Sequence, residues 1–343
     1  MDSINIIHCP VAEVGGHVIA MLAGGPVFIV CDSNVRGLAE RTGIKAEGIF
    51  EIEATEQGKS LETVLAIDRW LLEQGADRNA FVLGIGGGIT TDMTGFAASV
   101  YKRGVRFAFV PTTLLSQVDA AIGGKNGVNL DSYKNMIGVI RQPEAVFICP
   151  EPLDTLPYPQ IISGAAELIK TFIIQNEDDS YARTVKVLSG IRESGSLCGG
   201  SEKLNDLVAK AAMVKAGIAG RDPEEHGERR LLNLGHTFAH AIEKMSSERI
   251  AHGEAVSMGI ILAARLAEKM ALAEKGLATR LEADFTACGM PTVCPFKVGE
   301  LTDAMRKDKK AEGSGIHFVL PLCIGKVETR FLSPEFVTSL LEE

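Results

Sequence analysis

The spacing of apolar residues along this chain changes near residue 150. In the first part, short β-like runs alternate with amphipathic segments of helical spacing such as Leu61–Gln74. The β-like runs are Pro26–Cys31, Ile49–Ile52, Phe81–Gly86, Val105–Val110 and Val146–Ile148. This alternation predicts a mostly parallel sheet with helices on its faces.

From Pro157 onward, apolar residues recur at helical spacing instead. The expected helices include Ile162–Ile174, Leu204–Gly217, Leu231–Lys244, Gly253–Met270 and Leu277–Cys288. One late apolar run, Ile316–Leu322, is predicted to be a strand. Because 343 residues exceed one typical core, we expect two domains, an α/β domain over residues 1–150 and a helical domain over residues 151–343.

Composition excludes several classes of function. The net charge of −9 argues against a nucleic-acid partner. The seven cysteines contain no C-x-x-C pair, which is typical of free thiols in a reducing cytosol. The segment Met1–Asn5 has no basic start of a signal peptide, and no apolar run is long enough to cross a membrane. We therefore expect a cytoplasmic protein that acts on small molecules.

A glycine-rich turn lies in the segment Phe81–Asp92, where a strand runs into Gly86-Gly87-Gly88 and a helix starts near Ile89. Backbone without Cβ atoms can approach a pyrophosphate, and a helix N-terminus favours its charge. The spacing is not G-x-G-x-x-G, and the candidate acidic residue Asp32 precedes the glycines. A tight strand-to-helix turn is the alternative. Asp32 and Asn34 themselves either contact a ligand at the end of a strand or cap an ordinary turn.

Three histidines lie close together in the second part of the chain. His236 and His240 are four residues apart, on one face of a predicted helix, and His252 begins the next helix. They indicate a metal site, although a core histidine bonded to the backbone is the alternative for any one of them. Glu167 is the best candidate for a carboxylate ligand, because it and Lys170 interrupt an apolar helix. A salt-bridged stripe on the surface is the alternative for that pair.

Cationic residues beside glycines suggest that the ligand is an anion. Lys125 stands between Gly124 and Asn126 in a predicted loop, and Lys134-Asn135 follows. Lys215, Glu225 and Arg229 add charge just before the histidines. The run Arg306–Lys310 is more typical of a solvated charged segment.

Taken in order, these motifs resemble the 3-dehydroquinate synthase family of sugar-phosphate cyclases over nearly the whole chain. The matching segments are Gly86–Asp92, Arg103–Phe107, Pro111–Asp119, Gly123–Lys125, Lys134–Gly138, Gly164–Lys170, Leu232–His240, His252–Glu254 and Asp308–Lys310. The resemblance implies a Rossmann-like α/β domain that binds NAD and an all-α domain that binds zinc, with cobalt as a possible substitute. It also implies a homodimer.

The resemblance assigns roles residue by residue. It implies Glu167, His236 and His252 as metal ligands, so that His240 faces the substrate phosphate rather than the metal. The positions implied for NAD are Asp32, Asn34, Glu56, Lys59, Gly87, Gly88, Ile89, Asp92, Thr112, Thr113, Asp119, Lys134, Thr155 and Leu156. Those implied for substrate binding and catalysis are Arg103, Lys125, Asn135, Lys170, Lys215, Glu225, Arg229, Asn233, His240 and Lys309.

Three short segments depart from the family pattern. Thr90-Thr91 precedes Asp92 where an aliphatic residue and glycine are common, Ala120-Ala121 stands where serine is usual, and Gly124–Gly127 differs from the usual glycine-lysine loop. These positions belong to the cofactor and phosphate loops, and none of the changes removes a charged group.

The activity implied is the conversion of 3-deoxy-D-arabino-heptulosonate 7-phosphate to 3-dehydroquinate and phosphate in the shikimate pathway. It would proceed by transient oxidation with NAD, phosphate elimination, re-reduction and an intramolecular aldol step. Three alternatives stay open at this point: a sibling cyclase whose sugar phosphate lacks a carboxylate, a metal-dependent alcohol dehydrogenase, and a non-catalytic NAD-binding protein.

Overall fold

The computed structural model describes residues 4–22, 24–131, 133–194, 201–247, 249–308 and 315–342. Its packing divides the chain into two compact units. The first comprises Met1–Leu156 with Val208–Glu224, and the second comprises Pro157–Leu207 with Glu225–Glu343. Helix α7 (Ser201–Arg221) contributes residues to both. No helix in the described ranges is long and apolar enough to cross a membrane.

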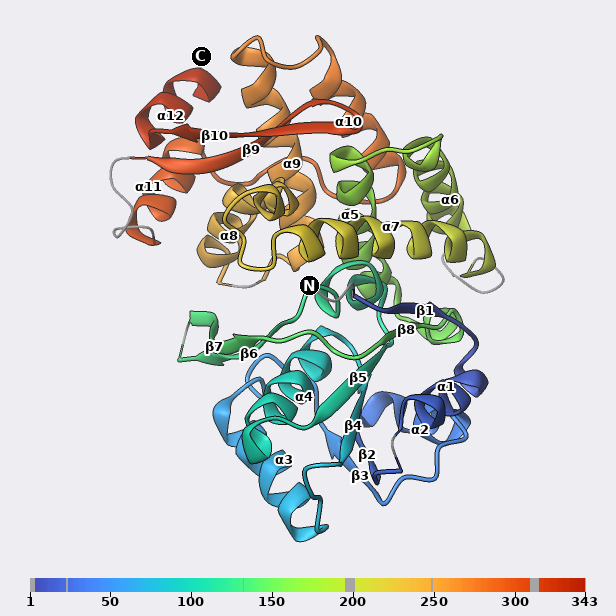
Figure 1. Cartoon of the computed structure of the whole chain (residues 1–343). Coiled ribbons are helices and arrows are strands. Elements are labelled where there is room, and N and C mark those ends of the chain that lie inside the picture. Colours follow the sequence, from blue (N-terminus) through green and yellow to red (C-terminus); the bar gives the residue numbers. More distant parts are fainter. Residues whose placement is uncertain are drawn as a thin grey trace. The chain divides into compact units, whose positions relative to one another are not determined.

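The first unit is built on a six-stranded sheet in which every pair of neighbours runs parallel (Figure 1). The strands lie in the order β1 (Ile6–His8), β8 (Val146–Ile148), β5 (Arg106–Pro111), β4 (Phe81–Gly86), β2 (Val27–Asp32) and β3 (Gly48–Ile52). The predicted parallel sheet is therefore confirmed, and β1 is an addition that the sequence pattern did not indicate.

Helices cover both faces of this sheet. Helices α1 (Val14–Met21) and α2 (Arg36–Arg41) lie on one side, and α3 (Leu61–Glu73) and α4 (Gly88–Val100) lie on the other (Figure 1). Because helices cover both faces, strand β2 is buried on both sides: all of the residues from Val27 to Cys31 are buried. Such continuous apolar strands are typical of parallel sheets.

The strand order reverses beside β2, because β3 and β4 pair with its opposite edges. Ligands of open α/β sheets bind at the carboxyl ends of the strands next to such a reversal. Asp32 is the last residue of β2, Gly86 is the last residue of β4, and Thr112 follows β5. The fold therefore brings three of the sequence-predicted nucleotide segments to one edge of the sheet.

The predicted loop around Lys125 is instead a β hairpin, made of β6 (Lys125–Leu130) and β7 (Tyr133–Ile140). Two glycines that face each other, Gly127 and Gly138, let the strands approach closely, since a Cβ on Gly138 would lie 2.2 Å from the carbonyl oxygen of Asn126. The Asn126 amide donates to the carbonyl oxygens of Gly124 and Arg141 and closes the hairpin base. The hairpin was not predicted from the sequence, because the glycine and asparagine residues in its strands are more typical of loops.

The second unit is helical, as predicted, and its described residues include an antiparallel hairpin. Its helices besides the first part of α7 are α5 (Tyr158–Ile174), α6 (Ser180–Ser194), α8 (His236–Met245), α9 (His252–Lys269), α10 (Leu277–Ala287), α11 (Val298–Asp308) and α12 (Pro334–Glu342). The hairpin pairs β9 (Ile316–Cys323) with β10 (Lys326–Leu332). β9 is the predicted late strand. β10 was not predicted, because its partly exposed residues give no apolar run.

The helix predicted from Leu231 begins at His236 instead, because Gly235 interrupts it. Gly235 has a φ of 78°, a left-handed conformation that glycine adopts without strain. Its lack of a side chain also permits a close helix crossing, since a Cβ there would lie 2.6 Å from Cγ1 of Ile260 in α9. A Cβ on Gly259 would in turn lie 2.2 Å from the Gly235 carbonyl oxygen. This crossing brings the starts of α8 and α9 together.

Candidate active site

Helix α5 carries a carboxylate and an ammonium group into the interior of the second unit. Glu167 is 0% exposed and Lys170 is 2% exposed, and Glu167 Oε2 forms an ion pair with Lys170 Nζ. The surface-stripe alternative for this pair is therefore wrong. Burying two charges is costly unless the geometry provides further partners, and here two imidazoles supply them.

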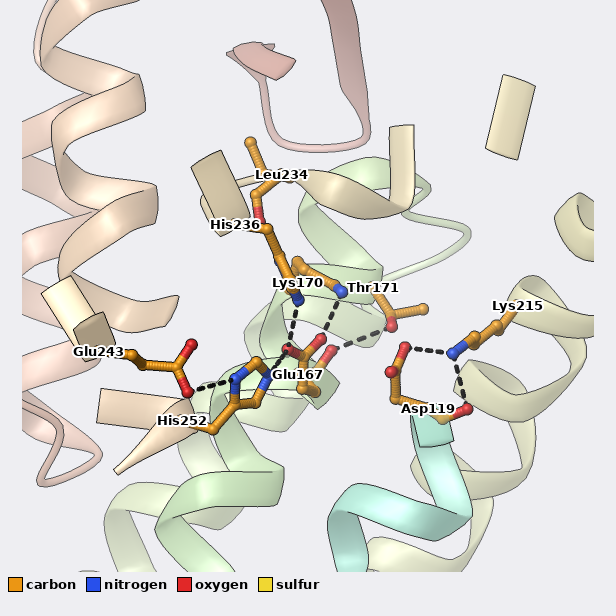
Figure 2. A network of polar contacts seen from close by, with 9 residues as sticks. All are labelled: Asp119, Glu167, Lys170, Thr171, Lys215, Leu234, His236, Glu243 and His252. Atoms are coloured by element: carbon orange, nitrogen blue, oxygen red, sulfur yellow. Dashed lines mark hydrogen bonds and ion pairs between the residues drawn. The ribbon is translucent and has the colours of Figure 1, made fainter. Parts of the chain in front are cut away.

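Glu167, His236 and His252 form a compact group of possible metal ligands (Figure 2). Glu167 Oε1 lies 3.4 Å from His236 Nε2 and 3.2 Å from His252 Nε2. One ligand atom from each residue lies within 4.8 Å of the other two. Two imidazole nitrogens and one carboxylate oxygen are a frequent ligand set of catalytic zinc, which keeps a further position for substrate. The three residues are those that the family resemblance implies.

The surroundings shift the pKa values of these three residues in different ways. Burial opposes the ionised form of Glu167, but the Lys170 ammonium and the two imidazoles outweigh it and hold the pKa of Glu167 well below its usual range. Burial and the Lys170 charge lower the pKa of His236 to about 3. Burial also opposes the charged form of His252, yet the hydrogen bonds to Glu167 and Glu243 outweigh it and raise the pKa of His252 to about 10. Glu167 and His236 are therefore in the protonation states that metal ligands require.

The far side of each imidazole also has a partner. His236 Nδ1 donates to the Leu234 carbonyl oxygen at 3.2 Å, and His252 Nδ1 lies 3.5 Å from Glu243 Oε1 (Figure 2). Sequence reasoning missed Glu243. The signal was present, because Glu243 follows His236 by seven residues and therefore shares its face of α8.

The other predicted residues of the second unit cluster before and along α8. His240 is exposed and does not belong to the ligand group, although its ring centroid lies 5.6 Å from that of His236. Arg229 is buried, and the Asn233 side-chain amide donates to Glu225 Oε1. Lys309 lies outside the described residues.

The glycine-rich turn of the first unit has no side chains at Gly87 and Gly88, so a ligand could approach its backbone closely. Gly87 precedes α4, and a Cβ at Gly88 would lie 2.9 Å from the Cβ of Ala120. A Cβ at Gly87 would lie 3.1 Å from Thr113 Cγ2. No side chain of Gly87 or Gly88 covers the backbone at the start of α4. The backbone N–H groups and the helix dipole at this position favour binding of a phosphate. At the end of β2, Asp32 Oδ1 accepts hydrogen bonds from the Asn34 backbone and side chain at 2.9 and 3.0 Å.

A polar network joins four more predicted residues of this unit. Lys59 Nζ lies 2.5 Å from both Asp92 Oδ2 and Asn135 Oδ1, and Lys59 is buried. Asn129 donates to Glu56 Oε2 at 2.9 Å and accepts from the Asn135 backbone at 2.9 Å. Burial raises the pKa of Asp92 to about 6, against the opposing charge of Lys59. The network ties the hairpin to the loop before α3.

The remaining predicted positions of the first unit are spread over several elements. Lys215 Nζ lies 2.6 Å from Asp119 Oδ1 and donates to the Asp119 carbonyl oxygen (Figure 2). Arg103 lies apart from these residues. It comes between α4 and the start of β5, near the amino ends of the strands, whereas the glycine turn lies at their carboxyl ends. Ile89 lies in the first turn of α4, Thr112 and Thr113 follow β5, Lys125 begins β6, and Lys134 lies in β7. Thr155 is the last residue of the 3-10 helix Glu151–Thr155, and Leu156 follows it.

Two of the three departures from the family pattern lie at the glycine turn, and the third, Gly124–Gly127, lies at the base of the β6–β7 hairpin. Thr90 and Thr91 are fully buried, and Thr91 Oγ1 donates to the Gly88 carbonyl oxygen at 3.0 Å. Ala120 is the residue that a Cβ at Gly88 would meet. Both substitutions therefore act on the shape of the turn and leave its charge unchanged.

Comparison with known proteins gives a consistent result over most of the chain. The family model for the N-terminal part of 3-dehydroquinate synthase matches residues 49–163, and the model for the C-terminal part matches residues 164–311. The 3-dehydroquinate synthase of Pyrococcus abyssi is 40% identical over 288 residues, covering 84% of this chain and 82% of that protein. The enzyme of Thermococcus kodakarensis is 43% identical over 287 residues, covering 82% and 79%.

Solved structures extend the comparison. A 2-epi-5-epi-valiolone synthase from Streptomyces hygroscopicus, solved with NAD⁺ and Zn²⁺ bound, has a TM-score of 0.85 and 26% identity, covering 100% of this chain and 96% of that one. A maleylacetate reductase from Agrobacterium tumefaciens has a TM-score of 0.67 at 16% identity, with coverage of 100% and 96%, and shows only that the fold is shared. Because both family models match in order and several relatives exceed a third identity over most of their length, this chain belongs to the 3-dehydroquinate synthase family.

Proposed function

We propose that this protein is a 3-dehydroquinate synthase. It converts 3-deoxy-D-arabino-heptulosonate 7-phosphate to 3-dehydroquinate and phosphate, a step of the shikimate pathway to chorismate and the aromatic amino acids. The observation that carries the proposal is the ligand group of Glu167, His236 and His252 in a chain that matches both parts of the family. The enzyme is a carbon–oxygen lyase that depends on NAD and a divalent metal.

The residues of this chain fit both cofactors. Glu167, His236 and His252 would hold zinc, or cobalt in its place, and their donor atoms support that choice. When bound, the nucleotide supplies a hydride acceptor that later returns the hydride, and the metal supplies a Lewis acid for the hydroxyl that is oxidised. Lys170 keeps the Glu167 carboxylate ionised, and the Leu234 carbonyl holds the Nδ1 proton of His236, which leaves Nε2 as its ligand atom.

We assign nucleotide binding to the α/β part, residues 1–150, and metal and substrate binding mainly to residues 151–343. The bare backbone at Gly87 and Gly88 and the carboxylate of Asp32 at the same sheet edge support the first assignment. The further nucleotide positions are Asn34, Glu56, Lys59, Ile89, Asp92, Thr112, Thr113, Asp119, Lys134, Thr155 and Leu156.

Cationic and amide side chains would bind the two anionic ends of the substrate. We propose Lys125, Asn135, Asn233, His240 and Lys309 for the phosphate, and Lys215 and Arg229 for the carboxylate. Lys170 and Glu225 complete the proposed set, and Arg103 is included from the family pattern alone, because it lies near the amino end of β5. Lys215 and Arg229 are 7% and 3% exposed, so an ion pair that either forms with the substrate would be little screened by water.

A sibling cyclase is the second candidate, since the solved 2-epi-5-epi-valiolone synthase has the same fold at 26% identity. The two candidates differ in whether the substrate carries a carboxylate. Purified protein is therefore incubated with the heptulosonate phosphate and, separately, with a sugar phosphate that lacks the carboxylate, and inorganic phosphate is assayed. Release from the first substrate alone is expected. Release from the second alone would make the chain a sibling cyclase.

We also propose that the protein is a cytoplasmic homodimer. Exposed apolar side chains on the β6–β7 hairpin support this proposal: Tyr133, Met136 and Ile140 are each more than half exposed. Apolar side chains grouped on one element often mark a protein–protein contact. Sedimentation of the wild type and of a variant with Met136→Lys and Ile140→Lys tests it. A wild-type dimer that the variant weakens is expected, and a wild-type monomer would contradict the proposal.

A further inference from the structure

His252 lies between two carboxylates. Its Nε2 lies 3.2 Å from Glu167 Oε1, and its Nδ1 lies 3.5 Å from Glu243 Oε1. Glu243 is 9% exposed and comes from α8, the helix that also carries His236 (Figure 2). One helix therefore supplies both a candidate ligand and the carboxylate behind the other candidate ligand.

The two candidate imidazole ligands have different partners at Nδ1. The Leu234 carbonyl can only accept, so Nδ1 of His236 carries a proton and Nε2 keeps its lone pair. When a metal displaces the proton from Nε2 of His252, a carboxylate at Nδ1 would retain the other proton, as in His236, and its negative charge would also make the ring a stronger electron donor. The two ligands are therefore alike in orientation and unequal in basicity.

The backbone of His252 is held firmly, whereas its ring depends on these side-chain contacts. His252 is the first residue of α9, where Glu254 Oε2 accepts from the Ala251 backbone N–H at 2.9 Å. The next residue, Gly253, lies so close to α5 that a Cβ there would be 2.4 Å from the Ser163 backbone. The imidazole itself is 31% exposed, so surrounding side chains do not enclose it. Glu243 is the partner that fixes the ring from the side away from Glu167.

We propose that Glu243 is a positioning residue of the metal site, which orients His252 and strengthens it as a ligand. This inference rests on the proposed metal site. Removing such a carboxylate from behind a ligating histidine typically weakens metal binding about 10- to 100-fold. The alternative is a structural carboxylate that only ties α8 to the start of α9.

The test measures the zinc affinity of purified, metal-free full-length protein by competition with a chromogenic chelator. It is made for wild type, Glu243→Gln and Glu243→Ala. A matched control is Glu282→Gln, which removes a carboxylate from the α9–α10 ion pair with Arg265, 2.9 Å in length and away from the site. The absorption spectrum of the cobalt-loaded proteins reports ligand geometry independently of activity.

We expect Glu243→Ala to bind zinc about 10- to 100-fold more weakly, with an altered cobalt spectrum. Glu243→Gln should lie between this variant and wild type, because its amide oxygen still accepts the Nδ1 proton without the charge. Glu282→Gln should match wild type. Unchanged affinity in both Glu243 variants would overturn the proposal. So would weaker binding with an unchanged cobalt spectrum, because that result marks a structural role. Failure of the wild type itself to bind zinc or cobalt would overturn the metal site and this inference with it.

Discussion

Glu167 and Lys170 lie one turn apart on α5 and form an ion pair in the interior of the second unit, where their side chains are 0% and 2% exposed. A buried ion pair contributes little to stability after the cost of desolvation. The pair is therefore better explained by function than by folding. His236 and His252 face the other oxygen of the same carboxylate.

Removing the carboxylate should empty this site. We expect Glu167→Ala to lower the metal content of the purified protein to background and to abolish phosphate release, because two imidazoles alone bind zinc weakly. Elemental analysis of the variant and of wild type checks the first result. We expect His236→Ala and His252→Ala to lose metal and activity as Glu167→Ala does. Full activity in a wild-type sample stripped of metal by exhaustive chelation would rule out the assignment.

The proposed substrate-binding cations predict a loss of substrate recognition when either is removed. Lys125→Ala and Arg229→Ala each remove a charge that a doubly anionic substrate would contact. Losing a charge-assisted hydrogen bond costs about 1.5–3 kcal/mol, which corresponds to a decrease in kcat/KM of at least about tenfold. Steady-state kinetics measures this value, with circular dichroism as the check that the fold is intact. A variant with wild-type kinetics would remove that residue from the proposed substrate-binding set.

The crossing of α8 and α9 predicts a stability difference between two glycines. Gly235 and Gly276 both precede a helix with a positive φ, of 78° and 87°. A Cβ at Gly276 meets nothing within 4 Å, whereas one at Gly235 meets Ile260 at 2.6 Å. Gly276→Ala should therefore cost about 1–2 kcal/mol of unfolding free energy from backbone strain alone. Gly235→Ala should cost more and also weaken zinc binding.

Chemical denaturation and zinc competition on the two glycine variants provide the comparison. Equal losses of stability, with unchanged zinc affinity in Gly235→Ala, would mean that the close helix crossing does not position the histidines.

Asp68 predicts how stability changes with pH. Burial raises the pKa of this carboxyl group on α3 to about 6 from an ordinary value of 3.8. The folded state therefore holds the proton more tightly than the unfolded state, so the free energy of unfolding falls as pH rises from about 4 to about 6. Asp68→Asn removes this titration. The stability of the variant relative to wild type should increase across that window and level off above it.

Denaturation curves at pH 3.5, 5 and 7.5 test the Asp68 prediction, with the exposed Asp154→Asn as a control in the same unit. A variant whose stability relative to wild type is independent of pH would contradict it.

The sequence predicts the parts of this molecule that depend on periodicity. Apolar runs such as Pro26–Cys31 indicated the parallel sheet, and the spacing of His236 and His240 indicated a metal site near the start of a helix. Spacing alone did not predict which histidines come together, because that depends on contact between helices; only the family resemblance implied His236 and His252. Gly235 and Gly259 set the crossing that brings His252 to His236, with ring centroids 5.3 Å apart. No local pattern reveals that contact.

The hairpin and Glu243 were missed for related reasons. Strands β6 and β7 contain glycine and asparagine, which are rare in strands, and they pair because Gly127 and Gly138 permit close approach. Glu243 looks like an ordinary polar residue on an amphipathic helix. Its partner lies on another helix, so only the fold shows what it contacts.

The most direct measurement of the proposed function follows phosphate and NADH together. Purified, zinc-loaded protein is supplied with the heptulosonate phosphate and a quantity of NAD far below that of substrate. Because a cyclase takes a hydride and returns it, phosphate should appear through many turnovers while absorbance in the NADH band stays flat. Accumulation of NADH in proportion to substrate loss would contradict this account and make the protein a dehydrogenase.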